Sequence, residues 1–225
     1  MRLSLVLAES ALELVPKEVR RSPAVLSDSR RREVDPSRIL LDRSFHHSAM
    51  AKLKDGQKRG RPDLVHAALL SATGAPLFLD GLMKLYVHTF QDMVLEIKEG
   101  TRLPKSYSRF RGLAEKLLVE EPQEGLVRVY RASMADLVRK ALSADLVVGL
   151  STQGRQTKLE ELAKMVVAAR TPCVIVGGFP HGHFMPETLR LTNTLVRIHS
   201  RPLEAHVVVA RVVYEVEKAL AGMND

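Results

Sequence analysis

The chain has 225 residues, of which 45% are hydrophobic, so a complete apolar core is available and a disordered chain is excluded. Its 34 Lys and Arg residues outnumber its 26 Asp and Glu residues, and the net charge of +8 indicates an anionic partner such as nucleic acid. Aromatic residues make up only 4%, which argues against binding of single strands by rows of stacked rings. A single cysteine, Cys173, excludes a disulfide framework and indicates a reducing, cytoplasmic environment.

The first half of the chain alternates between short apolar segments and charged ones. The apolar run that stops at Glu9 falls short of the roughly 7–15 residues of a signal peptide, so we interpret it as a buried strand. No stretch approaches the ~20 apolar residues that span a bilayer, so we expect no membrane partner. The predicted elements of this half are a strand at 2–8, a charged segment at 16–38, a strand at 39–42, a helix at 48–54, a basic loop at 54–61, a helix at 62–71, strands at 85–89 and 93–98, and a helix at 108–120.

The second half shows a cleaner alternation of strands and helices. Its strands are continuous apolar runs, which predicts an α/β fold with a parallel sheet covered by helices. The predicted elements are strands at 126–130, 144–150 and 172–178, and helices after the capping pairs Ser133/Asp136 and Thr157/Glu160. We expect a single domain over 1–225, with basic elaborations around 16–38, 52–63 and 101–111.

The last apolar run, 205–220, is rich in β-branched residues but too long for an ordinary strand, so we predict a helix. One face of this helix is more apolar than a terminal helix on a monomer should expose, which predicts a dimer. That face comprises Val209, Val212, Val213, Val216 and Leu220.

Two glycine-bearing segments follow predicted strands, at the place where open α/β sheets bind ligands. GLSTQGR at 149–155 is similar to half of a phosphate-binding P-loop but lacks the Lys-Ser/Thr pair, which disfavours nucleotide hydrolysis. GGFPHGH at 177–183 contains Gly177, Gly178 and Gly182, which allow close backbone approach to a ligand, although alone this segment is more typical of a tight turn. The histidines lack the spacing of a zinc site, so we expect no metal.

Two basic segments are candidates for contact with an anionic substrate. In RGRPDLVH, Arg59 and Arg61 precede Asp63 in the first turn of the predicted helix. One interpretation is compensation of the helix dipole, and the other is an arginine that binds phosphate beside a carboxylate that accepts a proton. The spacing does not separate the two. In TRLPKSYSRF, a solvated basic face and a phosphate-tracking surface both stay open for Arg102, Lys105 and Arg109.

One family is similar to this chain in five segments, which are, in order, LLDRSFHHSAMAKL, RGRPDLVHAALL, LYVHT, TRLPKSYSRFRGL and VGGFPHGHF. They resemble the ribosome-biogenesis pseudouridine N1-methyltransferases (Nep/Emg type) of the SPOUT superfamily. The resemblance extends from about Leu3 to Ala219. It implies a SPOUT-type sheet with helices on both faces, an elaborated N-terminal half and a C-terminal trefoil knot, a feature otherwise nearly absent from proteins.

The resemblance also implies S-adenosylmethionine as methyl donor, a pseudouridine in small-subunit ribosomal RNA as acceptor, a homodimer and a role in small-subunit biogenesis, with ribosomal assembly proteins as further candidate partners. The implied catalytic residues are Asp63 and Arg61. The implied RNA contacts are Arg59, Arg61, Arg102, Lys105 and Arg109. The implied cofactor contacts are Leu150, Gly177, Gly182, Ile198, His199, Ser200, Arg201, Pro202 and Leu203. The family usually has Asn-Tyr at Ser200-Arg201 and often has Arg at Lys105.

The expected chemistry agrees with these residues. Pseudouridine is joined to ribose through carbon, so its N1 keeps a proton that must leave during methyl transfer. Asp63 is the candidate that accepts or orients this proton, and because an isolated carboxylate is a weak base, a positioning role stays open. Two alternatives also stay open. One is an RNA-binding assembly factor whose methyl transfer is secondary or lost, and the other is a SPOUT enzyme for tRNA or another base.

Overall fold

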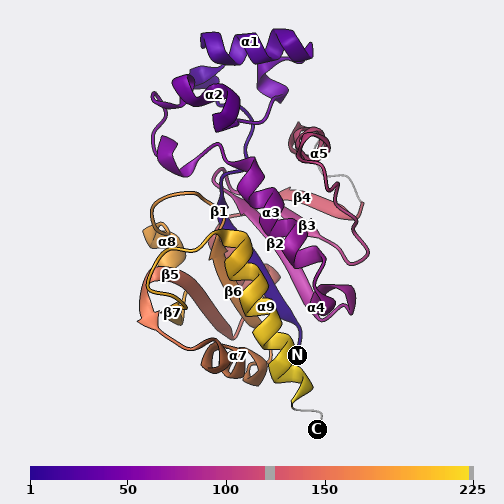
Figure 1. Cartoon of the computed structure of the whole chain (residues 1–225), viewed down its shortest axis with the longest axis vertical. Coiled ribbons are helices and arrows are strands. Elements are labelled where there is room, and N and C mark those ends of the chain that lie inside the picture. The colour runs from indigo at the N-terminus through magenta and orange to yellow at the C-terminus, as the bar shows by residue number, and fades with distance from the viewer. Residues whose placement is uncertain (120–124, 223–225) are drawn as a thin grey trace.

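A seven-stranded sheet forms the centre of the computed structural model, which describes residues 1–119 and 125–222 (Figure 1). The strands are β1 (Leu3–Ser10), β2 (Met83–Thr89), β3 (Met93–Ile97), β4 (Val127–Arg131), β5 (Leu146–Gln156), β6 (Pro172–Gly177) and β7 (Thr194–Arg197). Their order is β4-β3-β2-β1-β6-β5-β7. The predicted α/β fold is confirmed, and the five strands from β2 to β7 along this order pair in parallel. At the other edge β3 pairs antiparallel with β2, to which a short turn joins it, and β4 pairs antiparallel with β3.

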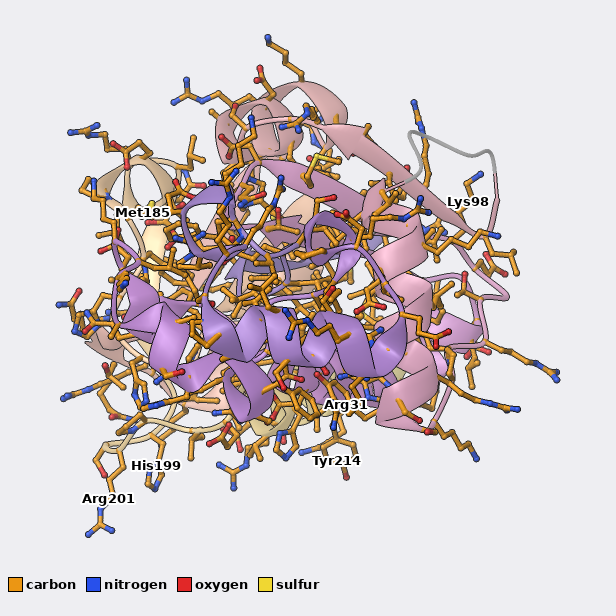
Figure 2. All side chains as sticks on the ribbon, turned by 90° about the horizontal axis from the view of Figure 1, so that it is seen from above. Arg31, Lys98, Met185, His199, Arg201 and Tyr214 are labelled. Atoms are coloured by element: carbon orange, nitrogen blue, oxygen red, sulfur yellow. The ribbon has the colours of Figure 1, made fainter. Side chains whose placement is uncertain are left out.

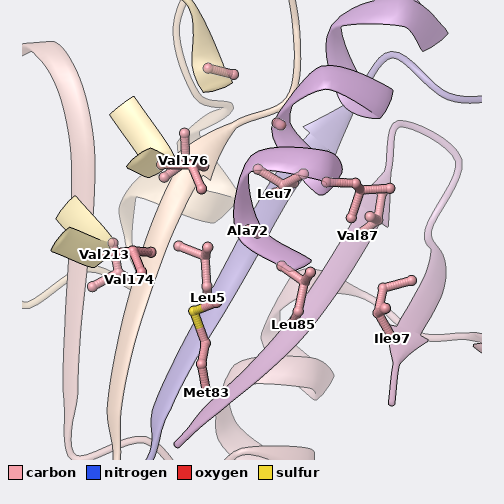
Figure 3. Packing of buried hydrophobic residues seen from close by; sticks show 14 of the residues in the cluster. Leu5, Leu7, Ala72, Met83, Leu85, Val87, Ile97, Val174, Val176 and Val213 are labelled. Carbon is pink, nitrogen blue, oxygen red and sulfur yellow. The ribbon is translucent and has the colours of Figure 1, made fainter. Parts of the chain in front are cut away.

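Strand β1 lies at the middle of the sheet, and every one of its residues is buried there. Leu5 is in register with Leu85 of β2 on one side and with Val174 of β6 on the other. Figure 3 shows Leu5, Leu85 and Val174 on the same face of the sheet, beneath Ala72 of one covering helix. Because side chains alternate between faces along a strand, the next residues of β1 pack on the opposite face.

Helices cover both faces of the sheet. The first face carries α3 (Pro62–Thr73), α5 (Tyr107–Val119), α7 (Leu159–Ala168) and α9 (Ala205–Ala221), and Figure 1 shows α3 and α9 in front of the strands. The second face carries α6 (Met134–Asp136), which continues as a π-helical turn at Leu137–Ala141, and α8 (Pro186–Leu189). A short helix, α4 (Pro76–Leu79), follows α3. The predicted helix at 205–220 is confirmed, and the one at 108–120 is α5, although residue 120 lies outside the described residues.

A small lobe with its own apolar core stands beyond one end of the sheet (Figure 1). It contains α1 (Pro23–Arg32), which begins with proline at its first position, and α2 (Arg43–Met50). The predicted helix at 48–54 is wrong, because the Asp42 carboxylate accepts the Ser44 N–H and starts α2 before the expected position. The predicted strand at 39–42 is also wrong, since Leu40 forms only an isolated bridge with Leu14.

Two further predictions about local structure fail near the end of β5. The strand continues through the segment 149–155 to Gln156, with a bulge between Leu150 and Arg155, so this segment belongs to β5 and does not follow it. Thr157 does not cap α7, because its hydroxyl donates to the Arg155 carbonyl and Lys158 occupies the N-cap position. The trefoil knot stays a prediction. None of the helices in the described ranges is both long and apolar enough to cross a membrane.

Candidate functional site

A cavity opens beside Leu150, Ser151 and Thr152 of β5 and at the carboxyl ends of β6 and β7. About 750 Å³ of space lies within it, part of which is open solvent. Parallel pairing brings these parts of the three strands side by side, so segments that are distant in sequence line one cavity. Eight of the nine residues predicted to contact a cofactor line it, namely Leu150, Gly177, Gly182, Ile198, His199, Arg201, Pro202 and Leu203. Ser200 does not.

Two glycines of the second loop are required by the path of the chain itself. A Cβ on Gly178 would lie 2.1 Å from the Ser10 hydroxyl and 2.9 Å from the Ser10 Cα, so only glycine lets β1 and β6 end side by side. Gly182 has a φ of 94°, in a region that favours glycine. The tight-turn interpretation therefore explains Gly178 and Gly182. The turn that contains them forms part of the cavity wall.

The third loop, Ile198–Leu203, forms the outer rim of the cavity. The Arg201 N–H donates to His199 Nδ1 at 3.1 Å, which closes a tight turn between β7 and α9. Figure 2 shows His199 and Arg201 projecting outward from the rest of the molecule. Arg201 thus lines the cavity while its side chain is exposed to solvent.

Several lining residues were missed by the sequence analysis. Val176 and Val196 are the last buried positions of β6 and β7, and Phe179 and Val208 come from the loop and helix that follow. Val176 could have been predicted as a lining residue, because it lies near the end of the strand predicted at 172–178. The contribution of Val208 depends on how α9 packs across the sheet, which no local pattern contains.

Arg61 and Asp63 form a pair at the start of α3. The guanidinium donates from Nε and one terminal nitrogen to the two carboxylate oxygens, each at 2.8 Å. Burial raises the pKa of Asp63, but the Arg61 guanidinium outweighs burial, so the pKa lies below its usual value. Asp63 is therefore ionised and a weaker base than an ordinary carboxylate. The charge of Glu204, which follows Leu203 of the cavity rim, also acts on Arg61.

Arg59 is not available to an external substrate. Its guanidinium donates to both carboxylate oxygens of Glu13 at 2.6 Å, lies 5.0 Å from the centroid of the Phe90 ring and is 9% exposed. The proposed RNA contact at Arg59 is therefore replaced by a buried ion pair. Sequence spacing could not distinguish Arg59 from Arg61, because the carboxylate that binds Arg59 comes from another segment.

The second basic segment is held against the body of the protein while its charges face solvent. His66 Nε2 is 2.7 Å from the Pro104 carbonyl oxygen, and the Tyr107 hydroxyl donates to the Asp42 carboxylate. The His66 ring also stacks on Phe110, with centroids 4.3 Å apart. The three cations of the segment are exposed, namely Arg102, Lys105 and Arg109.

The apolar face of α9 has a different role from the one predicted. Four of its valines are at most 2% exposed and pack into the main core, so they cannot form a dimer surface. These are Val209, Val212, Val213 and Val216. Within residues 1–119 and 125–222, no group of three or more His, Cys, Asp and Glu side chains is arranged to hold a metal ion.

The comparison with known proteins gives the family. A family model described as EMG1/NEP1 methyltransferase matches residues 5–217. The chain belongs to the EMG1/NEP1 methyltransferase family. This range includes both the cavity and the Arg61–Asp63 pair, and the resemblance expected from the sequence is confirmed.

Members of the EMG1/NEP1 family match over nearly their whole length. The protein named ribosomal RNA small subunit methyltransferase Nep1 from Pyrobaculum neutrophilum is 43% identical over 224 residues, which covers 97% of this chain and 99% of that protein. The protein of the same name from Staphylothermus marinus is 38% identical over 220 residues, covering 96% and 95%. The crystal structure of Archaeoglobus fulgidus Nep1 bound to S-adenosylhomocysteine is 35% identical, with a TM-score of 0.86 and coverage of 98% of this chain and 100% of that one.

Proposed function

We propose that the protein is an S-adenosylmethionine-dependent methyltransferase that modifies N1 of a pseudouridine in small-subunit ribosomal RNA and so serves small-subunit biogenesis. The observation that carries this proposal is the cavity beside β5 and at the ends of β6 and β7, in a chain whose relatives are named small-subunit ribosomal RNA methyltransferases. The A. fulgidus relative, whose fold matches closely, was crystallised with the demethylated product of this donor.

The chemistry of the cavity fits such a cofactor. Its inner wall is apolar, with Leu150, Val176 and Val196 at most 8% exposed, which suits one face of an adenine ring. The segments around that wall include polar residues for the polar edges of the ligand, among them Ser151, Thr152 and His199. When bound there, S-adenosylmethionine supplies a methyl group on a sulfonium, whose leaving group is a neutral thioether.

Arg61 and Asp63 serve the RNA side of the reaction. Because both oxygens of Asp63 accept hydrogen bonds from Arg61, and because its pKa lies below the usual value, its proposed role is to hold and orient the guanidinium rather than to act as a strong base. The guanidinium, with a side chain 35% exposed, then presents its remaining N–H groups to a phosphate or a base edge. The proton on N1 then leaves to water, because the carboxylate is occupied by Arg61.

The exposed cations Arg102, Lys105 and Arg109 supply contacts to the RNA backbone. Their segment is fixed to α3 by His66, so these charges keep a constant position relative to Arg61. Charge alone gives no sequence selectivity, and the choice of nucleotide therefore depends on the groups at the cavity mouth.

We also infer a homodimer in the cytoplasm. Exposed apolar side chains on α4 and α9 and on the turn before β2 support the dimer, and the Glu217 carboxylate, which accepts the Leu77 N–H, joins the two helices. These side chains are Leu79, Leu82 and Tyr214. Light scattering at micromolar concentration is expected to give twice the monomer mass, and the monomer mass would contradict the dimer.

The direct test of the function is mass spectrometry of small-subunit RNA. RNA lacking the modification is incubated with protein and methyl donor and then digested into fragments. One fragment is expected to gain a single methyl group, and the gain must map to a pseudouridine. A methyl group on any other nucleoside would contradict the assignment.

A further inference from the structure

A buried ammonium group lies behind the second loop of the cavity. Lys58 Nζ donates to Glu9 Oε2 at 2.7 Å and to the His183 carbonyl oxygen at 2.5 Å. It also lies 4.3 Å from the centroid of the Phe179 ring. Phe179 and His183 both line the cavity, whereas Lys58 does not. A cation outside the cavity therefore contacts two residues of its wall.

Glu9 completes this arrangement from the end of β1. Its Oε2 accepts from Lys58, and its Oε1 accepts the backbone N–H of Met185 at 2.7 Å. The Glu9 side chain is 4% exposed, and its φ of 49° is one that residues other than glycine rarely adopt. Such a conformation persists where the surrounding structure fixes it, and it is enriched at functional sites.

The same short segment of chain also touches the RNA side of the site. The Ala11 carbonyl accepts the Arg61 N–H at 3.2 Å, and the Ala11 N–H donates to the Gly178 carbonyl at 2.8 Å. Lys58 itself lies three residues before Arg61 in the basic loop. The end of β1 is thus fastened to the cavity loop on one side and to the residues before α3 on the other.

We propose that Glu9 and Lys58 are positioning residues that hold the segment 179–185 in the shape the cofactor requires, an inference that rests on the proposed function. A buried ion pair is weak evidence for stability, because desolvation of both charges offsets their attraction. Its directional contacts to the His183 carbonyl and the Met185 N–H instead specify one loop conformation. Affinity for the cofactor then depends on a pair of residues outside the cavity.

The adjacent residue provides a matched control. Arg59 forms an equally buried ion pair with Glu13, which fastens the same basic loop to the same region after β1. Its other contacts are the Lys54 carbonyl and the Phe90 ring, and neither belongs to the cavity. Loss of the Arg59–Glu13 pair therefore removes a comparable buried ion pair but no contact to the segment 179–185.

The first measurement is calorimetric binding of S-adenosylhomocysteine. The double variant Glu9→Gln/Lys58→Met leaves no unpaired buried charge, and its Kd is expected to rise by roughly 10- to 100-fold, the worth of a hydrogen bond to a charged group. Glu13→Gln/Arg59→Met is expected to stay within about threefold of the wild type. A wild-type Kd for the first variant, or an equal loss in both, would overturn the proposal. The KM for S-adenosylmethionine should rise while kcat at saturating cofactor is kept.

The second measurement needs no cofactor. Hydrogen exchange of the peptide that contains Met185 is expected to be faster in Glu9→Gln/Lys58→Met and unchanged in Glu13→Gln/Arg59→Met, both in ligand-free protein. The single variant Glu9→Gln keeps Lys58 and is expected to give a smaller increase, which provides a readout if the double variant is unstable. Wild-type protein that binds no S-adenosylhomocysteine would contradict the proposed function, whereas unchanged exchange would contradict the positioning role.

Discussion

Arg61 and Asp63 face each other across one turn at the start of α3, joined by two parallel hydrogen bonds of 2.8 Å. The sequence alone left two interpretations of this Arg-Pro-Asp segment open, namely compensation of the helix dipole and phosphate binding beside a proton acceptor. The structure shows that the Asp63 carboxylate binds the Arg61 guanidinium directly. Proline between them begins the helix, and Arg61 stands at the N-cap with non-helical backbone angles (φ −130°, ψ 60°). This geometry supports the proposal that Asp63 acts on the substrate through Arg61.

The first prediction concerns this pair. Asp63→Asn is expected to lower single-turnover methyl transfer by about 10²-fold, because a misplaced guanidinium no longer holds the substrate in line. Arg61→Lys keeps the charge but cannot make the paired hydrogen bonds, so its loss should be similar. The double variant should lose little more than either single one, and S-adenosylhomocysteine should bind all three as it binds the wild type. Losses that multiply in the double variant would show that the two residues act separately.

The second prediction concerns the wall of the cavity. Gly182→Val places a branched side chain at a φ of 94° beside the cavity, and S-adenosylhomocysteine binding is expected to be lost while the protein stays folded. Gly100→Val is the control, because Gly100 has a similar φ of 78° but a Cβ added there would meet no atom within 4 Å. Calorimetric binding of S-adenosylhomocysteine to both variants distinguishes a general effect of backbone strain from a specific loss of the cavity. Retained binding in Gly182→Val would remove this loop from the cofactor site.

The third prediction concerns the exposed basic segment. Replacement of Arg102 or Arg109 by Ala should reduce the log–log salt slope of RNA binding by about one unit, since each phosphate contact releases counterions. Lys164→Ala serves as the control, because Lys164 is also exposed but lies on α7, in another part of the molecule (Figure 1). Equal slopes for all variants would show that the segment is only a solvated face.

The fourth prediction concerns stability at acidic pH. Burial lowers the pKa of His46 below its usual value, although Asp28 and Asp42 oppose this, so the unfolded chain binds the proton more readily than the native one. Stability is therefore expected to fall as the pH decreases from about 7 to 5, by at most ~1.4 kcal/mol per pH unit for this group. His46→Gln should reduce the slope, whereas His47→Gln, at the exposed neighbouring position, should not. Chemical denaturation across this pH range measures both slopes.

Much of the fold could be predicted because its signals are local. The apolar runs of β1, β5 and β6 are buried on both faces, and the valine spacing of α9 is helical. The helix α1 was missed because its sequence is strongly basic and only Val25 and Asp28 are buried. The strand β7 was missed because it is short and only Val196 is fully buried.

The site was predictable to the extent that its residues lie at or after the buried parts of parallel strands. Leu150 and Gly177 line one cavity because parallel pairing sets Leu150 beside Val176 of β6 and Val196 of β7. The different fates of Arg59 and Arg61 were not predictable, since Glu13 approaches from 46 residues away. The role of the apolar face of α9 was not predictable either. An apolar sequence pattern does not show whether a helix packs on the sheet of its own chain or on a second chain.

The most direct test of the proposed function is single-turnover methyl transfer to two RNA hairpins that differ only in one nucleoside. The first carries pseudouridine at the candidate position and the second carries uridine, whose N1 is bonded to ribose and cannot accept a methyl group. We expect transfer to the pseudouridine hairpin and none above background to the uridine hairpin. Equal transfer to both hairpins, or none to either in protein that binds S-adenosylhomocysteine, would contradict the proposed function.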